Sequence, residues 1–206
     1  MTFKDRHDAG KLLAFALKDH LSKDPSDVVV VGLPRGGVIV AYEIAKRLNL
    51  PLDTMVIKKI GHPDNSEYAV GAVGSSEIFL NPDVSISTDY VKQQARQLRS
   101  EITRQVAIYH KDFKPIELKG KQIVLVDDGI ATGLTAKTAI AELRAAGAAK
   151  IILAVPVAAA DSLAELSHDA DDVVCLYTPA YFMAVGQFYQ LFEQVEEHQV
   201  AKTLRS

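Results

Sequence analysis

The sequence predicts an α/β fold in which a central, mostly parallel sheet is flanked by helices. Strand-like and helix-like segments alternate along the 206 residues, which is the pattern of repeated β–α units. Residues 28–31, four consecutive valines, are apolar on both faces, as a strand covered by helices on two sides must be. Residues 68–80 break the alternation and predict a small antiparallel excursion beside this sheet.

Strands are predicted where short apolar runs lie between turn-forming residues. They span residues 28–31, 53–58, 122–126, 151–155 and 172–177. Gly71 and Gly74 interrupt the antiparallel excursion, and residues 61–65 (Gly-His-Pro-Asp-Asn) predict a mobile loop because they are rich in turn formers.

Helices are predicted from apolar residues at helical spacing and from the residues that end them. They span residues 8–20, 38–48, 87–110, the segment after 135 as far as 146, 161–166 and 186–198. The second ends at Asn49, because Pro51 cannot continue it, and the fourth stops at Gly147. The helix over 87–110 is rich in Gln, Arg and Lys, which predicts one solvated face.

Composition narrows the class of protein. A net charge of −3 gives no electrostatic footprint for nucleic acid. Cys175 is the only cysteine and lies in an apolar run, so we expect a buried structural thiol and no intramolecular disulfide. The charged N-terminus does not resemble a signal peptide, and no apolar run is long enough to span a membrane. We therefore expect a cytoplasmic protein with one domain over residues 1–206.

The most informative motif, residues 127–135, follows the strand at 122–126 and reads Asp-Asp-Gly-Ile-Ala-Thr-Gly-Leu-Thr. Backbone N–H groups at the start of the next helix can bind an anion, and Thr132 and Thr135 add hydroxyl donors. Asp127 and Asp128 would repel a phosphate, so they must serve sugar hydroxyls or a metal ion. A ligand with phosphate, ribose and a magnesium-chelating group satisfies both halves. The alternative is a plain turn followed by an ordinary helix cap.

A second candidate anion site, residues 32–37 (Gly-Leu-Pro-Arg-Gly-Gly), follows the strand at 28–31. Its glycines let backbone N–H groups approach an anion, and Arg35 carries a fork of donors suited to phosphate oxygens. Both motifs follow parallel strands, at the edge where open α/β sheets bind ligands. The alternative is that Pro-Arg-Gly-Gly is a common turn. Lys58 and Lys59 precede the 61–65 loop, and either can be a ligand contact or a solvated side chain.

These motifs resemble those of the type I phosphoribosyltransferases, which transfer ribose 5-phosphate from 5-phosphoribosyl-1-diphosphate to a nucleophile. The resemblance runs from about residue 27 to 177 and is specific only at 32–37 and 127–135. The chain is more particularly similar to a group of uncharacterised small phosphoribosyltransferase-domain proteins. The resemblance implies the type I phosphoribosyltransferase fold, an Mg²⁺-dependent enzyme that releases diphosphate, an acceptor that is a nucleobase, a flexible loop that closes over the site, and a homodimer.

The resemblance also assigns roles to residues of this chain. The catalytic residues would be Asp127, Asp128, Arg35 and Lys59. The 5-phosphate and ribose would contact Asp127, Asp128, Gly129, Ala131, Thr132, Gly133, Leu134 and Thr135. The diphosphate would contact Pro34, Arg35, Gly36, Gly37 and Lys58. Asp127 and Asp128 would hold Mg²⁺ directly or through water.

The acceptor stays open between orotate, uracil, a purine and an unusual nucleophile. Several purine-salvage members of the family place an aspartate where this chain has Ala131, which puts purine salvage by that route in doubt. Pro156 and Val157 resemble the position from which the family contacts the acceptor. Residues 177–182 either form an aromatic shelf for it or pack in the core. His62 and Glu67 lie near the loop lysines, and no spacing selects them.

Two other hypotheses belong to different classes. A nucleotide-sensing or 5-phosphoribosyl-1-diphosphate-sensing regulator could keep the pocket and catalyse nothing, but the nucleic-acid binders with this fold need a basic face, which the acidic net charge does not support. An NAD-type dinucleotide-binding domain is disfavoured because no Gly-x-Gly-x-x-Gly follows the first strand.

Overall fold

The structure, a computed structural model, describes residues 1–206 apart from the side chain of Glu67, so the candidate contact at that side chain lies outside the described part. Five strands form one sheet in the order β2-β1-β6-β7-β8, and every neighbouring pair is parallel. Their bounds are β1 Val28–Gly32, β2 Leu52–Thr54, β6 Gln122–Val126, β7 Lys150–Val157 and β8 Asp172–Tyr177. The predicted central parallel sheet is confirmed.

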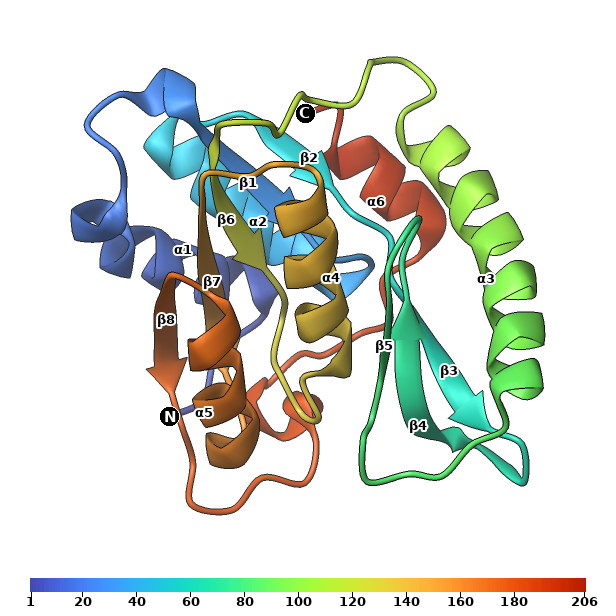
Figure 1. The fold of residues 1–206 in the computed structure, drawn as a ribbon. Coiled ribbons are helices and arrows are strands. Elements are labelled where there is room, and N and C mark those ends of the chain that lie inside the picture. Colours follow the sequence, from blue (N-terminus) through green and yellow to red (C-terminus); the bar gives the residue numbers. More distant parts are fainter.

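Helices cover both faces of this sheet (Figure 1). On one face lie α1 (Arg6–Ala16) and α2 (Gly36–Leu48), and on the other lie α4 (Leu134–Ala145) and α5 (Ala160–Asp169). Successive residues of a strand point to opposite faces. Val28 and Val30 of β1 accordingly pack with α1 and α2, whereas Val29 and Val31 pack with α4. This two-sided burial explains why the strand is apolar throughout.

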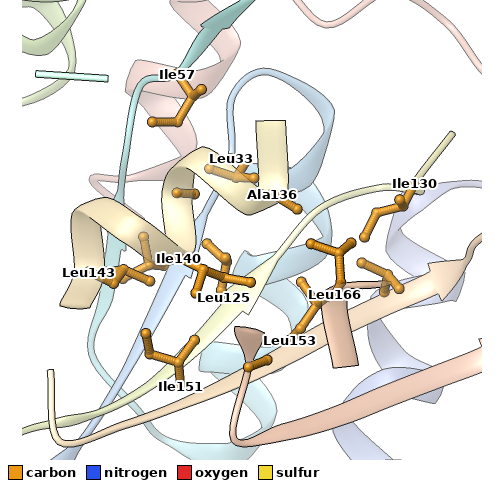
Figure 2. Close-up of a cluster of buried hydrophobic side chains, with 14 of the residues drawn as sticks. Leu33, Ile57, Leu125, Ile130, Ala136, Ile140, Leu143, Ile151, Leu153 and Leu166 are labelled. Carbon is orange, nitrogen blue, oxygen red and sulfur yellow. The ribbon is translucent and has the colours of Figure 1, made fainter. Parts of the chain in front are cut away.

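The cluster on the α4 face fixes the start of that helix relative to the ends of the strands (Figure 2). Leu125 of β6 and Leu153 of β7 meet Ile140 and Leu143 of α4 and Leu166 of α5. Each of these side chains is almost fully buried. Burying one such side chain contributes about 1.5–3 kcal/mol. The turn between β6 and α4 is therefore anchored at both ends by packed apolar residues.

A second sheet is antiparallel, in the order β3-β4-β5, and contains the predicted excursion. Its strands are β3 Lys58–His62, β4 Asn65–Val73 and β5 Ile78–Leu80. The long helix α3 (Thr88–Tyr109) packs on it, and α6 (Glu197–Thr203) contacts both α2 and α3. Three short 3-10 helices complete the described elements: η1 Lys18–His20, η2 Pro25–Asp27 and η3 Val185–Phe188.

The predicted strand over 53–58 is confirmed at its start and wrong beyond Thr54, because the chain leaves the parallel sheet there and joins the antiparallel sheet at Lys58. The two apolar residues between them point into different cores: Val56 packs with α3 and Ile57 with α4. The predicted loop over 61–65 is also wrong. His62 of β3 pairs with Asn65 of β4, which leaves a hairpin turn of two residues.

The predicted helix over 186–198 is wrong as well. The chain forms η3, runs without regular structure, and becomes helical only in α6. Phe188 and Tyr189 pack against Phe3, and the backbone N–H of Gln190 donates to the carbonyl of Phe3 at 2.9 Å. These contacts with the N-terminal segment hold the backbone away from a helical path. The other predicted helices are confirmed, with ends shifted by a few residues. None of the described helices combines the length and apolar composition needed to cross a bilayer.

Candidate active site at the ends of β1 and β6

Two loops meet where β1 and β6 end. Gly32 and Val126 are partners in the parallel register, and the N–H of Leu33 donates to the carbonyl of Val126 at 2.8 Å. A Cβ atom at Gly37 would lie 2.8 Å from Cα of Asp127, so only glycine permits this close approach. The structure thus brings the two sequence motifs side by side. The peptide bond between Pro34 and Arg35 is cis.

These loops line one pocket with a volume of about 390 Å³. Eleven residues of the predicted site lie in its wall: Pro34, Arg35, Gly36, Lys59, Asp127, Asp128, Gly129, Ala131, Thr132, Gly133 and Thr135. The wall is completed by five apolar residues: Ile57, Ile130, Ala136, Val185 and Phe192. The pocket therefore combines backbone donors, cations, carboxylates and a short apolar surface.

Three predicted contacts do not line this pocket. Gly37 is buried against Asp127 and acts as a spacer between the loops. The side chain of Leu134 is buried in the apolar cluster below α4, which leaves only its backbone as a candidate donor. Lys58 faces α3, and its Nζ lies 3.9 Å from a carboxylate oxygen of Glu101. Adjacent residues of a strand point to opposite sides, so only Lys59 of the two lysines reaches the pocket.

The turn before α4 presents donors to this pocket. Gly133 precedes the helix with a φ of 73°, a left-handed conformation that favours glycine, and it offers no side-chain cap. The first N–H groups of α4 therefore lack intrahelical partners, and the helix dipole adds partial positive charge there. Thr132 and Thr135 line the pocket at the same point. This arrangement is suited to an anion such as a phosphate.

The acidic pair lies beside these donors, and both carboxylates are partly buried. Burial and the neighbouring charge of Asp128 raise the pKa of Asp127 well above its usual value, although Lys59 opposes the shift. The N–H of Asp128 donates to Oδ1 of Asp127 at 2.8 Å. Two negative charges are thus held close together, and they repel each other. Hydroxyl donors or a cation from a ligand would reduce this repulsion.

Arg6 of α1 compensates the charge of Asp128, which the sequence analysis missed. Its Nε donates to Oδ2 of Asp128 at 2.7 Å, and its Nη1 donates to the carbonyl of Glu193 at 2.8 Å. The guanidinium lies 3.9 Å from the ring centroid of Phe192. Tyr189 adds a further contact, since its hydroxyl donates to the carbonyl of Asp128 at 2.6 Å. The first helix and the C-terminal segment therefore both hold the acidic pair.

The expected acceptor contacts are placed differently. Pro156 and Val157 are buried inside β7 and do not line the pocket. The rings of Tyr177 and Phe182 pack against Phe188, with centroids 5.9 and 5.3 Å away, so the core-packing alternative holds for both. Tyr181 is 88% exposed. No aromatic shelf forms from residues 177–182, and Val185 and Phe192 supply the apolar wall instead.

The carboxylates of the pocket suit a magnesium ion only when a substrate supplies further ligands. Among the described side chains, no group of three or more His, Cys, Asp or Glu residues could enclose a metal ion. Mg²⁺ commonly binds one or two carboxylates together with substrate phosphates and water. Asp127 and Asp128 supply two carboxylates, and one of them is already paired with Arg6. These residues suit an ion that arrives with a diphosphate-bearing ligand.

Comparison with known proteins places the chain among similar sequences and folds. A provisionally named phosphoribosyl transferase from Mycobacterium tuberculosis (strain H37Rv) is 45% identical over 207 residues, covering 98% of this chain. The chain spans only 46% of that relative's length. The crystal structure of TT1426 from Thermus thermophilus superimposes with a TM-score of 0.84 and 38% identity, and the match covers 99% of this chain and 98% of that one.

A more distant relative carries a different name. The transcriptional regulator GfcR of Methanococcoides burtonii is 29% identical over 154 residues, covering 71% of this chain and 70% of the regulator. The phosphoribosyl transferase domain matches residues 2–189, which include both loops of the pocket and the whole parallel sheet. The chain therefore belongs to the phosphoribosyl transferase domain family.

Proposed function

We propose that this protein transfers a 5-phosphoribosyl group from 5-phosphoribosyl-1-diphosphate to an acceptor and releases diphosphate. The observation that carries the proposal is the joint lining of one pocket by the uncapped start of α4, the acidic pair and the Pro34–Arg35 loop. A donor with two phosphate-bearing ends and a sugar between them needs these three features in one place.

In the proposed complex the 5-phosphate binds the N-terminus of α4 and the hydroxyls of Thr132 and Thr135. Asp127 and Asp128 accept hydrogen bonds from the ribose hydroxyls between the two loops. The diphosphate binds the backbone of the Pro34–Arg35 loop together with the cations Arg35 and Lys59. Hydrogen bonds to charged groups contribute about 1.5–3 kcal/mol each, so a few of them suffice to hold the donor.

In the proposed reaction the bond between the anomeric carbon and a diphosphate oxygen breaks, and a bond between that carbon and a nucleophilic atom of the acceptor forms. Positive charge then develops on the sugar ring, and the carboxylates of Asp127 and Asp128 stabilise it. Arg35 and Lys59 stabilise the negative charge of the leaving diphosphate. Asp127 and Asp128 would hold Mg²⁺, which would supply additional neutralisation of the leaving group.

We take the acceptor to be a nucleobase, because Val185 and Phe192 form an apolar wall beside the acidic pair. Ala131 offers no proton acceptor at the position where some relatives have an aspartate. The nucleobase must therefore lose its proton to solvent or to the departing diphosphate. The resemblance to the family also leads us to propose a homodimer, which light scattering after size-exclusion chromatography would test.

A screen of nucleobases and other nucleophiles with the donor and Mg²⁺, followed through diphosphate release, tests the proposal. We expect release with at least one acceptor and none with the Asp127→Asn/Asp128→Asn double variant. The matched control replaces two acids far from the pocket, Asp19 and Asp112, in the same way. Release that is independent of the acceptor, or unaffected in the first variant, would contradict the proposed transfer.

A second candidate function is a sensor that binds the donor or a nucleotide without turnover. The 29% identity to a transcriptional regulator supports this second function. An electrophoretic mobility assay with DNA, with and without the donor, separates the two functions. Donor-dependent DNA retention without diphosphate release would favour the sensor, and turnover without retention would favour the transferase.

A further inference from the structure

A second pocket shares the Pro34–Arg35 loop with the first. It has a volume of about 350 Å³ and is lined by the loop, by residues 56–58 at the start of β3, and by the helices α3 and α6. Pro34, Arg35 and Ile57 line it as well as the first pocket. The rest of its wall consists of Val56, Lys58, Arg104, Gln105, Tyr109 and Glu197. We call it the α3 pocket.

The lining of the α3 pocket carries more positive than negative charge, with three cations (Arg35, Lys58 and Arg104) and one carboxylate (Glu197). Arg35 and Lys58 also have acidic neighbours outside the wall, but these lie beyond hydrogen-bonding distance. Arg35 lies 3.9 Å from Glu196 and Lys58 lies 3.9 Å from Glu101. Both carboxylates are about half exposed, so water screens these pairs. Arg35 and Lys58 therefore remain available to an anion.

The third cation is bound tightly by a carboxylate of the chain itself. Arg104 donates from Nη1 and Nη2 to the two carboxylate oxygens of Glu197, at 3.1 and 2.7 Å. Nε2 of Gln105 donates to the same carboxylate at 2.7 Å. These bonds lower the pKa of Glu197 to about 2, so the group is an anion at any physiological pH. A guanidinium that binds a carboxylate through two N–H donors can bind a phosphate in the same way.

A tyrosine hydroxyl in this wall has no partner. Tyr109 is fully buried, and its hydroxyl is one of the few buried polar atoms of the described side chains that make no hydrogen bond. Burial raises the pKa of this phenol, the charge of Glu197 raises it further, and Arg35 and Arg104 lower it. Tyr109 is itself one of the residues that line the α3 pocket. Buried polar groups usually have partners, and an oxygen of a ligand would supply one here.

We propose that the α3 pocket is a second binding site, specific for a phosphate-type dianion. Arg104, Lys58 and Arg35 neutralise the dianion, and the hydroxyl of Tyr109 donates a hydrogen bond to it. Glu197 occupies the position of the dianion when none is bound and moves outward on α6 when one enters. The ligand is either free inorganic phosphate or the phosphate group of a small monoester.

Arg35 links this site to the first pocket, because its side chain belongs to both walls. A dianion in the α3 pocket draws the guanidinium away from a diphosphate in the first pocket. The two ligands then weaken each other's binding by the same factor, as thermodynamic linkage requires. The site itself does not depend on the proposed transferase activity, since phosphate binding is measured without donor or acceptor.

Titration of the ¹⁵N-labelled protein with inorganic phosphate at constant ionic strength tests the proposal by NMR. The Arg104 Nε and Gln105 side-chain amide resonances report on the α3 pocket, whereas the backbone amides of residues 132–136 report on the start of α4. We expect both groups of resonances to shift and saturate, each with its own dissociation constant. A parallel titration with glycerol 1-phosphate shows whether a monoester or free phosphate binds the α3 pocket more tightly.

One variant should weaken phosphate binding in the α3 pocket, and another should strengthen it. Tyr109→Phe removes a hydroxyl without a partner, so the fold keeps its stability while phosphate binds the α3 pocket about tenfold more weakly, the equivalent of 1.4 kcal/mol. Glu197→Gln removes the competing carboxylate, and binding becomes several-fold tighter. Neither change alters the dissociation constant reported by residues 132–136. Tyr42→Phe, on α2 and outside both pockets, is the matched control and leaves both constants unchanged.

Three outcomes would overturn the proposal. The first is an absence of saturable shifts at Arg104 and Gln105 in both the unaltered protein and the Glu197→Gln variant. The second is equal affinity in the Tyr109→Phe and Tyr42→Phe variants. The third is a loss of both constants together in Tyr109→Phe, which would mean that a single site explains all the shifts.

Discussion

Arg6 and Asp128 form a hydrogen-bonded ion pair, with 2.7 Å between Nε and Oδ2, although 122 residues separate them in the chain. Their side chains are only 11% and 15% exposed. The pair joins the first turn of α1 to the acidic turn after β6. It also leaves Asp127 as the carboxylate of the pair that has no cation bonded to it among the described side chains.

Replacing Arg6 with Ala should therefore destabilise the fold and disturb the site. A charge left unpaired in a largely buried position lowers the free energy of unfolding by about 3 kcal/mol. Urea denaturation measures this change. The control is Arg47→Ala, which removes a half-exposed cation 3.8 Å from Glu43 and should change the free energy by less than about 0.5 kcal/mol, because Glu43 keeps its hydrogen bond with His7. Equal losses in the two variants would show that Arg6 has no special role.

Replacing Asp127 with Asn should raise stability at neutral pH while it abolishes most of the proposed turnover. The pKa of Asp127 is raised in the folded state, so the contribution of this carboxyl is most favourable below its unfolded pKa of 3.8 and is lost as the pH rises through the folded value. Asparagine avoids that loss. We expect a higher midpoint of thermal unfolding at pH 7 and no difference at pH 3. A lower midpoint at pH 7 would contradict the raised pKa.

Replacing Thr132 with Val should weaken binding of the 5-phosphate by removing one hydroxyl donor at the start of α4. One hydrogen bond to a charged group corresponds to a loss of roughly tenfold or more in affinity. Calorimetric titration with ribose 5-phosphate measures it. Thr103→Val on the exposed face of α3 is the matched control and should bind as the unaltered protein does. Equal affinity in both variants would remove Thr132 from the proposed site.

The sequence predicted the parts of the fold that local patterns determine. The central strands are apolar on two faces, and α2 and α4 end at left-handed residues, Asn49 and Gly147, so their places could be read directly. The two anion motifs follow neighbouring strands of the sheet. That topology explains why eleven of the predicted site residues line one pocket.

Contacts between distant segments determine what the sequence did not predict. The segment 186–198 is not helical because Phe188 and Tyr189 pack on Phe3, at the other end of the chain. Arg6 carries no local pattern that points to Asp128. Lys58 and Lys59 are equivalent in the sequence, and only the orientation of β3 sends one to the first pocket and the other to α3. Such choices require the positions of partners that are distant in the sequence.

The buried pair between Asp53 and His110 should make stability depend on pH. Nε2 of His110 lies 2.6 Å from Oδ1 of Asp53, and it ties the end of α3 to the edge strand β2. The hydrogen bond with Asp53 raises the pKa of His110 above 6.5, although burial opposes the shift. The stability that this pair contributes is therefore fully present below pH 6.5, and it is lost as the pH rises through the pKa of His110 in the folded protein. We expect the free energy of unfolding to fall as the pH rises above 6.5, and to fall less steeply in His110→Gln. The control is His7→Gln, because His7 pairs with Glu43 at an exposed site. If His110→Gln kept the full pH dependence, other groups would have to account for it.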